Sequence, residues 1–132
     1  MLIWKDEYSI GVDLIDTQHK YLFTLWNNTY DLLGNESCMN KYDKVFEMID
    51  DLRQYARFHF QSEENYMLKI KYDQLFSQKI EHAEFMKKIE KMDYKLLDKN
   101  PKKYLEDWLG FILNWILDHV LHKDKLITSG NR

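Results

Sequence analysis

Turn-forming residues and cysteine are scarce in this sequence. One Pro and four Gly among 132 residues leave few positions for turns, which predicts long regular elements. Cys38 has no second cysteine to pair with, so a disulfide within the chain is excluded. Its neighbours, NESCMN, are typical of a loop, and we interpret Cys38 as an inert thiol rather than a redox sensor.

Long apolar runs and basic clusters are also lacking. The longest apolar run, WLGFILNWIL, contains Asn114 and is too short to span a bilayer, so we expect no membrane association. The opening residues, MLIWKDEYSI, lack the pattern of a signal peptide, and we expect a cytoplasmic protein. A net charge of −3, with Lys interspersed among Asp and Glu, argues against nucleic-acid binding.

What remains is a composition typical of a soluble globular protein. Hydrophobic residues make up 45% of the chain and charged residues 31%. The length suits one domain, which we assign to residues 1–132. No strongly apolar outer face is visible in the pattern, so we expect a monomer.

Apolar residues recur at steps of three or four in four segments, which is the spacing of helices packed in a bundle. The predicted core positions are Ile15, His19, Leu22, Trp26, Thr29 and Leu33; Val45, Ile49, Leu52, Ala56, His59, Glu63, Tyr66 or Met67, and Ile70; Leu75, Gln78, His82, Phe85, Ile89, Met92 and Leu96; and Leu105, Trp108, Ile112, Trp115 and His119.

Stop and start signals separate these segments. The polar stretch 35–40 follows Gly34, Asp73 can cap the third segment, and Asn100 with Pro101 suits a helix start. Short connections favour antiparallel neighbours. We therefore predict an all-α, antiparallel up-down-up-down four-helix bundle, preceded by an N-terminal arm over residues 1–13.

Polar side chains interrupt the predicted core in every segment. They are His19, His59, Glu63, Gln78, His82 and His119. Asp124 follows His119 by five residues, a rotation of about 140°, and would converge with it only if the helix end bends or tightens. An unpaired buried carboxylate costs several kcal/mol. A bound cation would compensate it and engage the imidazoles, so we predict a metal site rather than a metal-free polar network.

The donor types restrict the metal. Imidazole and carboxylate without thiolate suit iron, zinc, copper or manganese. Six or seven donors are too many for one tetrahedral zinc and about right for two metals that share carboxylates, for which bundle cores are a known location.

The chain resembles the hemerythrin family in its bacterial single-domain form. The resemblance covers essentially the whole chain and is carried by IWKDEYSIGVDLIDTQHKYLF, HFQSE, KYDQLFSQKIEHAEF and HVLHKD, in family order. It implies two iron ions joined by an oxo or hydroxo bridge. By this resemblance His19 and His59 would hold one iron, His82 and His119 with a third His would hold the other, and Glu63 and Asp124 would bridge the two.

The third helix departs from the family pattern, which is H-x-x-x-H where this chain has QKIEH. Gln78 stands in place of the third His. Its amide oxygen could ligate iron, although an amide is a poorer donor than imidazole, or it could hydrogen-bond a water in the vacant position. His122 does not obviously compensate, and we interpret it as a surface residue.

Apolar residues lie within a turn of the predicted ligands. Leu22, Phe60, Ile116 and Val120 flank His19, His59 or His119. The resemblance implies that such residues surround dioxygen at the iron with two His ligands, where a coordination position is open. Trp115 is interpreted as packing rather than chemistry.

The resemblance implies a protein that binds dioxygen for storage, delivery or sensing, and we expect no enzyme activity because no substrate-sized feature or separate acid–base residue is apparent. Gln78 keeps an alternative open: a di-iron redox enzyme of oxidase or peroxidase type, or a nitric-oxide-binding protein. A third possibility is a scaffold bundle with a structural metal, but this would require full coordination at every metal.

Overall fold

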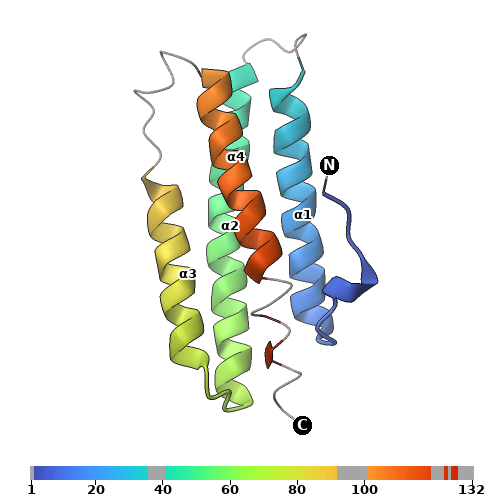
Figure 1. The fold of residues 1–132 in the computed structure, drawn as a ribbon, viewed down its shortest axis with the longest axis vertical. Coiled ribbons are helices and arrows are strands. Elements are labelled where there is room, and N and C mark those ends of the chain that lie inside the picture. The colour runs from blue at the N-terminus through green and yellow to red at the C-terminus, as the bar shows by residue number, and fades with distance from the viewer. Residues whose placement is uncertain (1, 36–40, 92–100, 120–123, 125, 128–132) are drawn as a thin grey trace.

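A computed structural model describes residues 2–35, 41–91, 101–119, 124 and 126–127. The described helices are α1 (Asp13–Leu33), α2 (Lys41–Lys69), α3 (Leu75–Glu90) and α4 (Pro101–Asp118), and a 3-10 turn, η1 (Asp6–Tyr8), precedes them. Neighbouring helices run in opposite directions, in the order up, down, up, down (Figure 1). The predicted all-α four-helix bundle is confirmed. None of the described helices is long and apolar enough to cross a membrane.

The N-terminal arm is docked on α1. The Asn27 side chain accepts a hydrogen bond from Leu2 N at 2.8 Å and donates one to Leu2 O at 2.6 Å. The Trp4, Tyr8 and Phe23 rings lie edge to face, with centroids 5.4 to 5.6 Å apart. Such aromatic pairs are favourable beyond the area that they bury.

Asp16 ties the end of the arm to the first turn of α1. Its carboxylate accepts hydrogen bonds from Ser9 Oγ at 2.6 Å and from Ile10 N at 2.9 Å. Gly11, with φ of +86°, makes the reversal between arm and helix, in a conformation that other residues rarely adopt.

The buried faces of the first three helices follow the predicted stripes. All six predicted positions of α1 are buried, and on α2 the buried residue near the C-terminus is Met67 rather than Tyr66. On α3, Gln78, His82, Phe85 and Ile89 are buried, whereas the predicted core position Leu75 is half-buried, as is Ile70 beyond the end of α2. The predicted positions Met92 and Leu96 lie outside the described residues.

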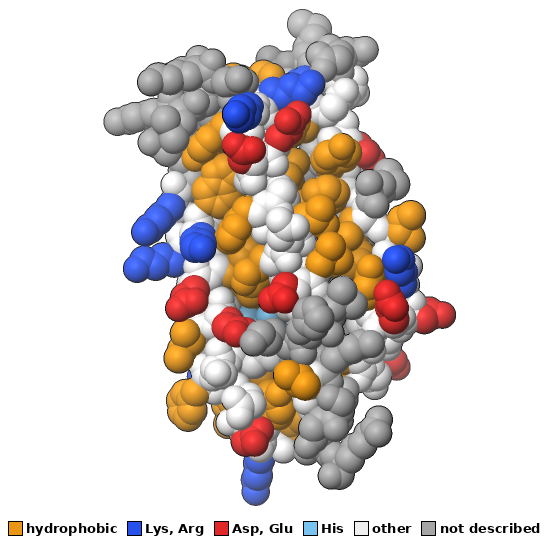
Figure 2. Space-filling view, in the orientation of Figure 1, with side chains coloured by type: hydrophobic (Ala, Val, Ile, Leu, Met, Phe, Trp, Pro, Cys, Tyr) orange, Lys and Arg blue, Asp and Glu red, His pale blue; other side chains and the backbone are white. Residues whose placement is uncertain are grey.

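The prediction for α4 was partly wrong. Its buried residues are Leu105, Leu109, Ile112 and Ile116, whereas Trp108 and Trp115 are half-buried. The apolar face of α4 is broad, and the smaller aliphatic side chains occupy its centre while the two large indoles lie at its margin. Hydrophobic side chains accordingly reach the surface on the face of the bundle shown in Figure 2.

Two predicted helix boundaries also differ. The residue that precedes α3 is Gln74 rather than Asp73, and it makes no side-chain capping bond. Helix α2 ends at Lys69, before Ile70, and Lys71 takes a left-handed conformation with φ of 57° in the turn. Pro101 begins α4 as predicted, while Asn100 and Cys38 lie outside the described residues.

Candidate metal centre

The predicted ligands converge because the helices alternate in direction. His19 lies near the start of α1, His59 and Glu63 in the second half of α2, His82 in α3, and His119 directly after α4. These positions share one level of the bundle. All of these side chains are buried, with 0 to 3% of their surface exposed.

Glu63 lies between two pairs of histidines. Its Oε2 is 3.5 Å from Nε2 of His19 and 3.3 Å from Nε2 of His59. Its Oε1 is 3.1 Å from Nε2 of His82 and 3.1 Å from Nε2 of His119. Each carboxylate oxygen therefore faces a different pair of imidazoles, which is the arrangement expected of a ligand shared by two metals.

Asp124 makes a second connection between the two pairs of histidines, His19 with His59 and His82 with His119. Its Oδ2 is 2.8 Å from Nε2 of His19, and its Oδ1 is 2.7 Å from Nε2 of His119. The backbone at His119 and at Asp124 is π-helical, a conformation with hydrogen bonds between residues five apart. Asp124 therefore converges with His119, which the spacing allows only if the helix end bends or tightens; residues 120–123 between them lie outside the described residues.

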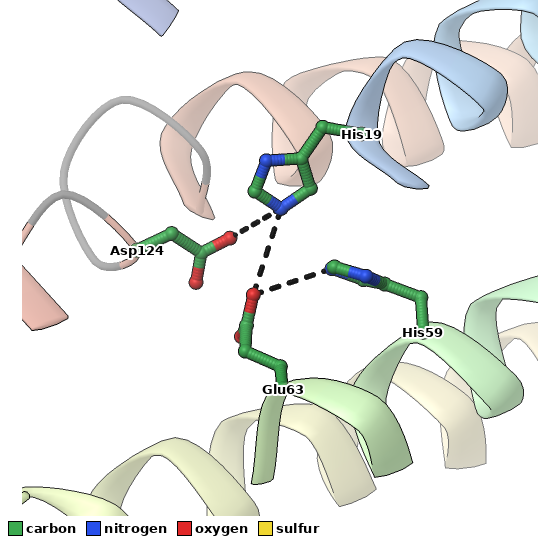
Figure 3. A group of neighbouring side chains, drawn as sticks. All are labelled: His19, His59, Glu63 and Asp124. Atoms are coloured by element: carbon green, nitrogen blue, oxygen red, sulfur yellow. Dashed lines mark ion pairs between the residues drawn. The ribbon is translucent and has the colours of Figure 1, made fainter. Parts of the chain in front are cut away.

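The buried donors fit a bound metal. Two groups of side chains each bring their donor atoms within 4.8 Å of one another: His19, His59, Glu63 and Asp124, drawn in Figure 3, and Glu63, His82 and His119. Within the described part of the chain, Nε2 of His19 and of His59 and both oxygens of Asp124 have no hydrogen-bond partner. They approach one another without hydrogen-bond geometry, as expected of atoms directed at a shared point. Unsatisfied buried polar atoms are costly, and a cation would satisfy them.

The charges of the cluster are strongly coupled. Burial favours neutral His19 and His119, but the carboxylates of Asp124 and Glu63 outweigh it and raise the pKa of His19 to about 9 and that of His119 to about 10. Burial lowers the pKa of His59. Burial disfavours ionised Glu63, yet His59, His119 and His19 together hold its pKa well below the ordinary range. Without metal, the carboxylates are thus neutralised by protons on the imidazoles, and protons and metal compete for the same nitrogens.

Two further residues orient the imidazoles from outside the cluster, and sequence reasoning missed both. Nδ1 of His59 lies 2.8 Å from Oε1 of Gln18, and Nδ1 of His82 lies 2.8 Å from Oε2 of Glu64. Each contact lets Nδ1 donate its proton outward and leaves Nε2 as an acceptor facing the centre. The available signal was adjacency, since Gln18 precedes His19 and Glu64 follows Glu63.

Aromatic rings cover the half that contains His82 and His119. Phe60 stacks on His82 with centroids 4.0 Å apart and an interplanar angle of 9°. Trp115 stacks on His119 at 4.4 Å and 14°, so this residue packs directly against a predicted ligand. Of the predicted pocket residues, Leu22, Phe60 and Ile116 are buried, whereas Val120, like His122, lies outside the described residues.

Gln78 lies one turn before His82 on the buried face of α3, and 3% of its surface is exposed. The amide therefore belongs to the interior of the bundle, as its position in the third stripe predicted. Its role as a ligand stays a prediction.

A comparison of the sequence with known protein families now decides the relationship. The family model described as "Hemerythrin HHE cation binding domain" matches residues 10–128. The chain belongs to the hemerythrin family. It is 44% identical to a bacteriohemerythrin of Clostridium acetobutylicum, over 95% of this chain and 97% of that protein.

More distant hemerythrins align over similar lengths. Identity is 29% to a bacteriohemerythrin of Methylococcus capsulatus, over 91% of this chain and 88% of that protein. It is 24% to a myohemerythrin of Theromyzon tessulatum, over 92% and 86%. Membership confirms the resemblance drawn from the sequence and implies a non-haem iron centre, which the cluster of His, Glu and Asp side chains fits.

Proposed function

We propose that this hemerythrin is a non-haem di-iron protein that binds dioxygen for storage, delivery or sensing, and not an enzyme. The proposal rests on the position of the Glu63 carboxylate between two pairs of histidines. Its Oε2 faces His19 and His59, and its Oε1 faces His82 and His119. A single metal would not require a buried carboxylate to face both ways.

The ligand assignment follows this division. His19 and His59 would hold one iron, and His82 and His119 the other, with Glu63 and Asp124 shared. An oxo or hydroxo bridge between the irons belongs to the proposal. When bound, the pair of irons supplies the electrons that dioxygen binding at such a centre requires.

The protein side chains prepare the site and keep water away from it. Gln18 and Glu64 fix the orientation of His59 and His82. Leu22 and Ile116 contribute buried apolar surface, and Phe60 covers one face of the His82 ring. An apolar surround limits proton delivery to a bound diatomic ligand while it admits the small molecule itself.

Gln78 supports a second candidate function. It is buried where the family pattern has a histidine, so the half with His82 and His119 has one imidazole fewer. Either the amide oxygen of Gln78 or a solvent molecule would then complete the coordination of that iron. An exchangeable position there would favour oxidase or peroxidase-like turnover, or nitric-oxide binding, over reversible dioxygen binding.

We further propose that residues 1–132 form a single hemerythrin-like domain and that it acts as a cytoplasmic monomer. The family match over residues 10–128 and the docking of the arm on α1 support the domain assignment.

An anaerobic titration tests the function. The metal-free protein is loaded with ferrous ion, the bound iron per chain is determined, and air is admitted while the visible absorption is recorded. We expect two irons per chain and a charge-transfer band that appears with air and disappears when oxygen is removed, over repeated cycles. Irreversible conversion to a ferric product would contradict the binding function and favour the redox enzyme. Uptake of fewer than two irons would contradict the di-iron centre.

A further inference from the structure

We propose that the groove between α3 and α4 is the route by which divalent metal ions reach the centre, drawn by the carboxylates of Glu81, Glu84 and Asp118 and received by His119. The inference rests on the proposed di-iron function and concerns how the centre is filled.

The groove is a cavity of about 210 Å³. Glu81 and Glu84 of α3 and Asp118, the last residue of α4, line it together with His119 and the aromatic side chains of Phe85, Phe111 and Trp115. In Figure 2 a small area of histidine surface is visible between acidic side chains on this face. Three carboxylates therefore line a hollow that leads to a predicted ligand of the metal.

His119 supplies an independent sign that the groove receives a cation. The residue is 3% exposed, and its Nε2 is engaged with the centre, 3.1 Å from Oε1 of Glu63. The other ring nitrogen, Nδ1, is buried and has no hydrogen-bond partner within the described residues. The imidazole thus both lines the groove and reaches the cluster, so a cation held by the carboxylates would lie next to the first ligand that it must meet.

A second cavity lies on the other side of α3, and its described lining has no excess of acidic residues. This cleft, of about 340 Å³, contains His82, and the described charged residues that line it are Arg57, Lys79 and Glu64. Arg57 is paired with Glu90. Glu64 is already engaged by His82 Nδ1. Among the described residues, the charged side chains that line the α3–α4 groove are Glu81, Glu84, Asp118 and Lys88. A divalent cation is therefore attracted more strongly to the α3–α4 groove than to the cleft.

The expected effect is on the rate of filling. Clefts lined by charge of one sign raise the association rate of an oppositely charged ligand by roughly 10- to 1000-fold, and this gain declines as salt screens the charges. The carboxylates of the groove are not among the predicted ligands of the finished centre. Their removal should slow loading and leave the final metal content unchanged.

The experiment measures ferrous ion uptake by the full-length metal-free protein under anaerobic conditions. A coloured ferrous chelator, added at set times after mixing, reports the iron that is not yet bound. For the variant with Glu81→Gln, Glu84→Gln and Asp118→Asn we expect loading about tenfold slower than wild type at low salt. The difference should shrink as salt is raised, and both proteins should bind the same final amount of iron.

Two further variants separate an effect of the groove from an effect of the overall charge of the protein. Asp31→Asn, Asp43→Asn and Glu47→Gln together remove the same net charge from exposed positions, each about 18 Å or more along its helix from His19 or His59. This control should load at nearly the wild-type rate. Lys88→Glu adds a carboxylate to the groove and should make loading faster than wild type.

Equal slowing by the groove variant and the distant control would overturn the proposal, since overall charge would then explain the rate. Unchanged loading in the groove variant would overturn it too. If the wild-type protein itself takes up no iron, the proposed di-iron function fails and the route falls with it. If only the route is wrong, the wild type still fills to its full iron content.

Discussion

Nδ1 of His82 lies 2.8 Å from Oε2 of Glu64, a half-buried carboxylate that follows the shared ligand Glu63 on α2. The contact joins α2 to α3 at the level of the cluster and decides which nitrogen of His82 faces inward. Adjacent residues of one helix thus serve the site differently, one within the cluster and one behind it.

Replacing Glu64 tests whether its contact with His82 strengthens iron binding. In Glu64→Ala the His82 ring loses its outer partner, and we expect iron affinity at this half to fall roughly 10- to 100-fold. Glu64→Gln retains an acceptor oxygen and should lose less. Competition with a chelator of known affinity measures the change, and equal affinity in wild type and Glu64→Ala would refute the role.

Restoring the family pattern tests the departure at the third helix. Gln78→His should place a third imidazole beside His82 and slow both iron loss and oxidation by air. Loss of a residue that only orients a ligand lowers metal affinity roughly 10- to 100-fold, and we expect the effect of an added ligand on iron loss to be at least as large. Gln78→Ala, which offers no donor, is the matched comparison. If Gln78→Ala equals wild type, the amide does not ligate.

The stability of the metal-free protein should decline with rising pH. His19 and His119 have pKa values raised from 6.5 to about 9 and about 10 in the folded state, so their protonation favours folding. This contribution is complete below pH 6.5 and is lost as the pH rises toward about 10. On the acid side, Glu63, whose pKa is lowered by folding, loses its contribution as it is protonated, and the lowered pKa of His59 acts in the same direction.

Thermal unfolding from pH 6 to pH 10, with chelator present, measures this dependence. The iron-loaded protein provides the contrast, because bound metal keeps the imidazoles deprotonated and is released on acidification. We therefore expect the alkaline decline in Tm only without metal. A metal-free Tm that rises between pH 7 and pH 10 would contradict the assigned charge states.

The arm should contribute to stability through Asp16. In Asp16→Ala the amide of Ile10 and the hydroxyl of Ser9 lose their acceptor, and we expect a loss of about 1 to 3 kcal/mol in the free energy of unfolding. Asp13→Ala, an exposed carboxylate in the same helical turn, should change it by no more than about 0.5 kcal/mol. Urea denaturation of both variants gives the comparison.

The sequence by itself determined the helices and the inward placement of the polar residues. Periodicity alone assigned His19, His59, Glu63 and His82 to buried faces, because the helical repeat of 3.6 residues leaves little choice once the apolar stripe is recognised. Motif order then indicated the family, and the family match agrees.

Tertiary structure decided what depends on the rotation and docking of whole elements. The broad apolar face of α4 is compatible with several rotations of the helix about its own axis. In the rotation that packing favours, Leu109 and Ile116 are buried, and Trp108 and Trp115 are half-buried. The π-helical backbone at His119 and at Asp124 has no signature in the helical repeat. The contacts of Gln18 with His59 and of Glu64 with His82 join different helices, so their formation depends on interhelical distances that no spacing along one helix encodes.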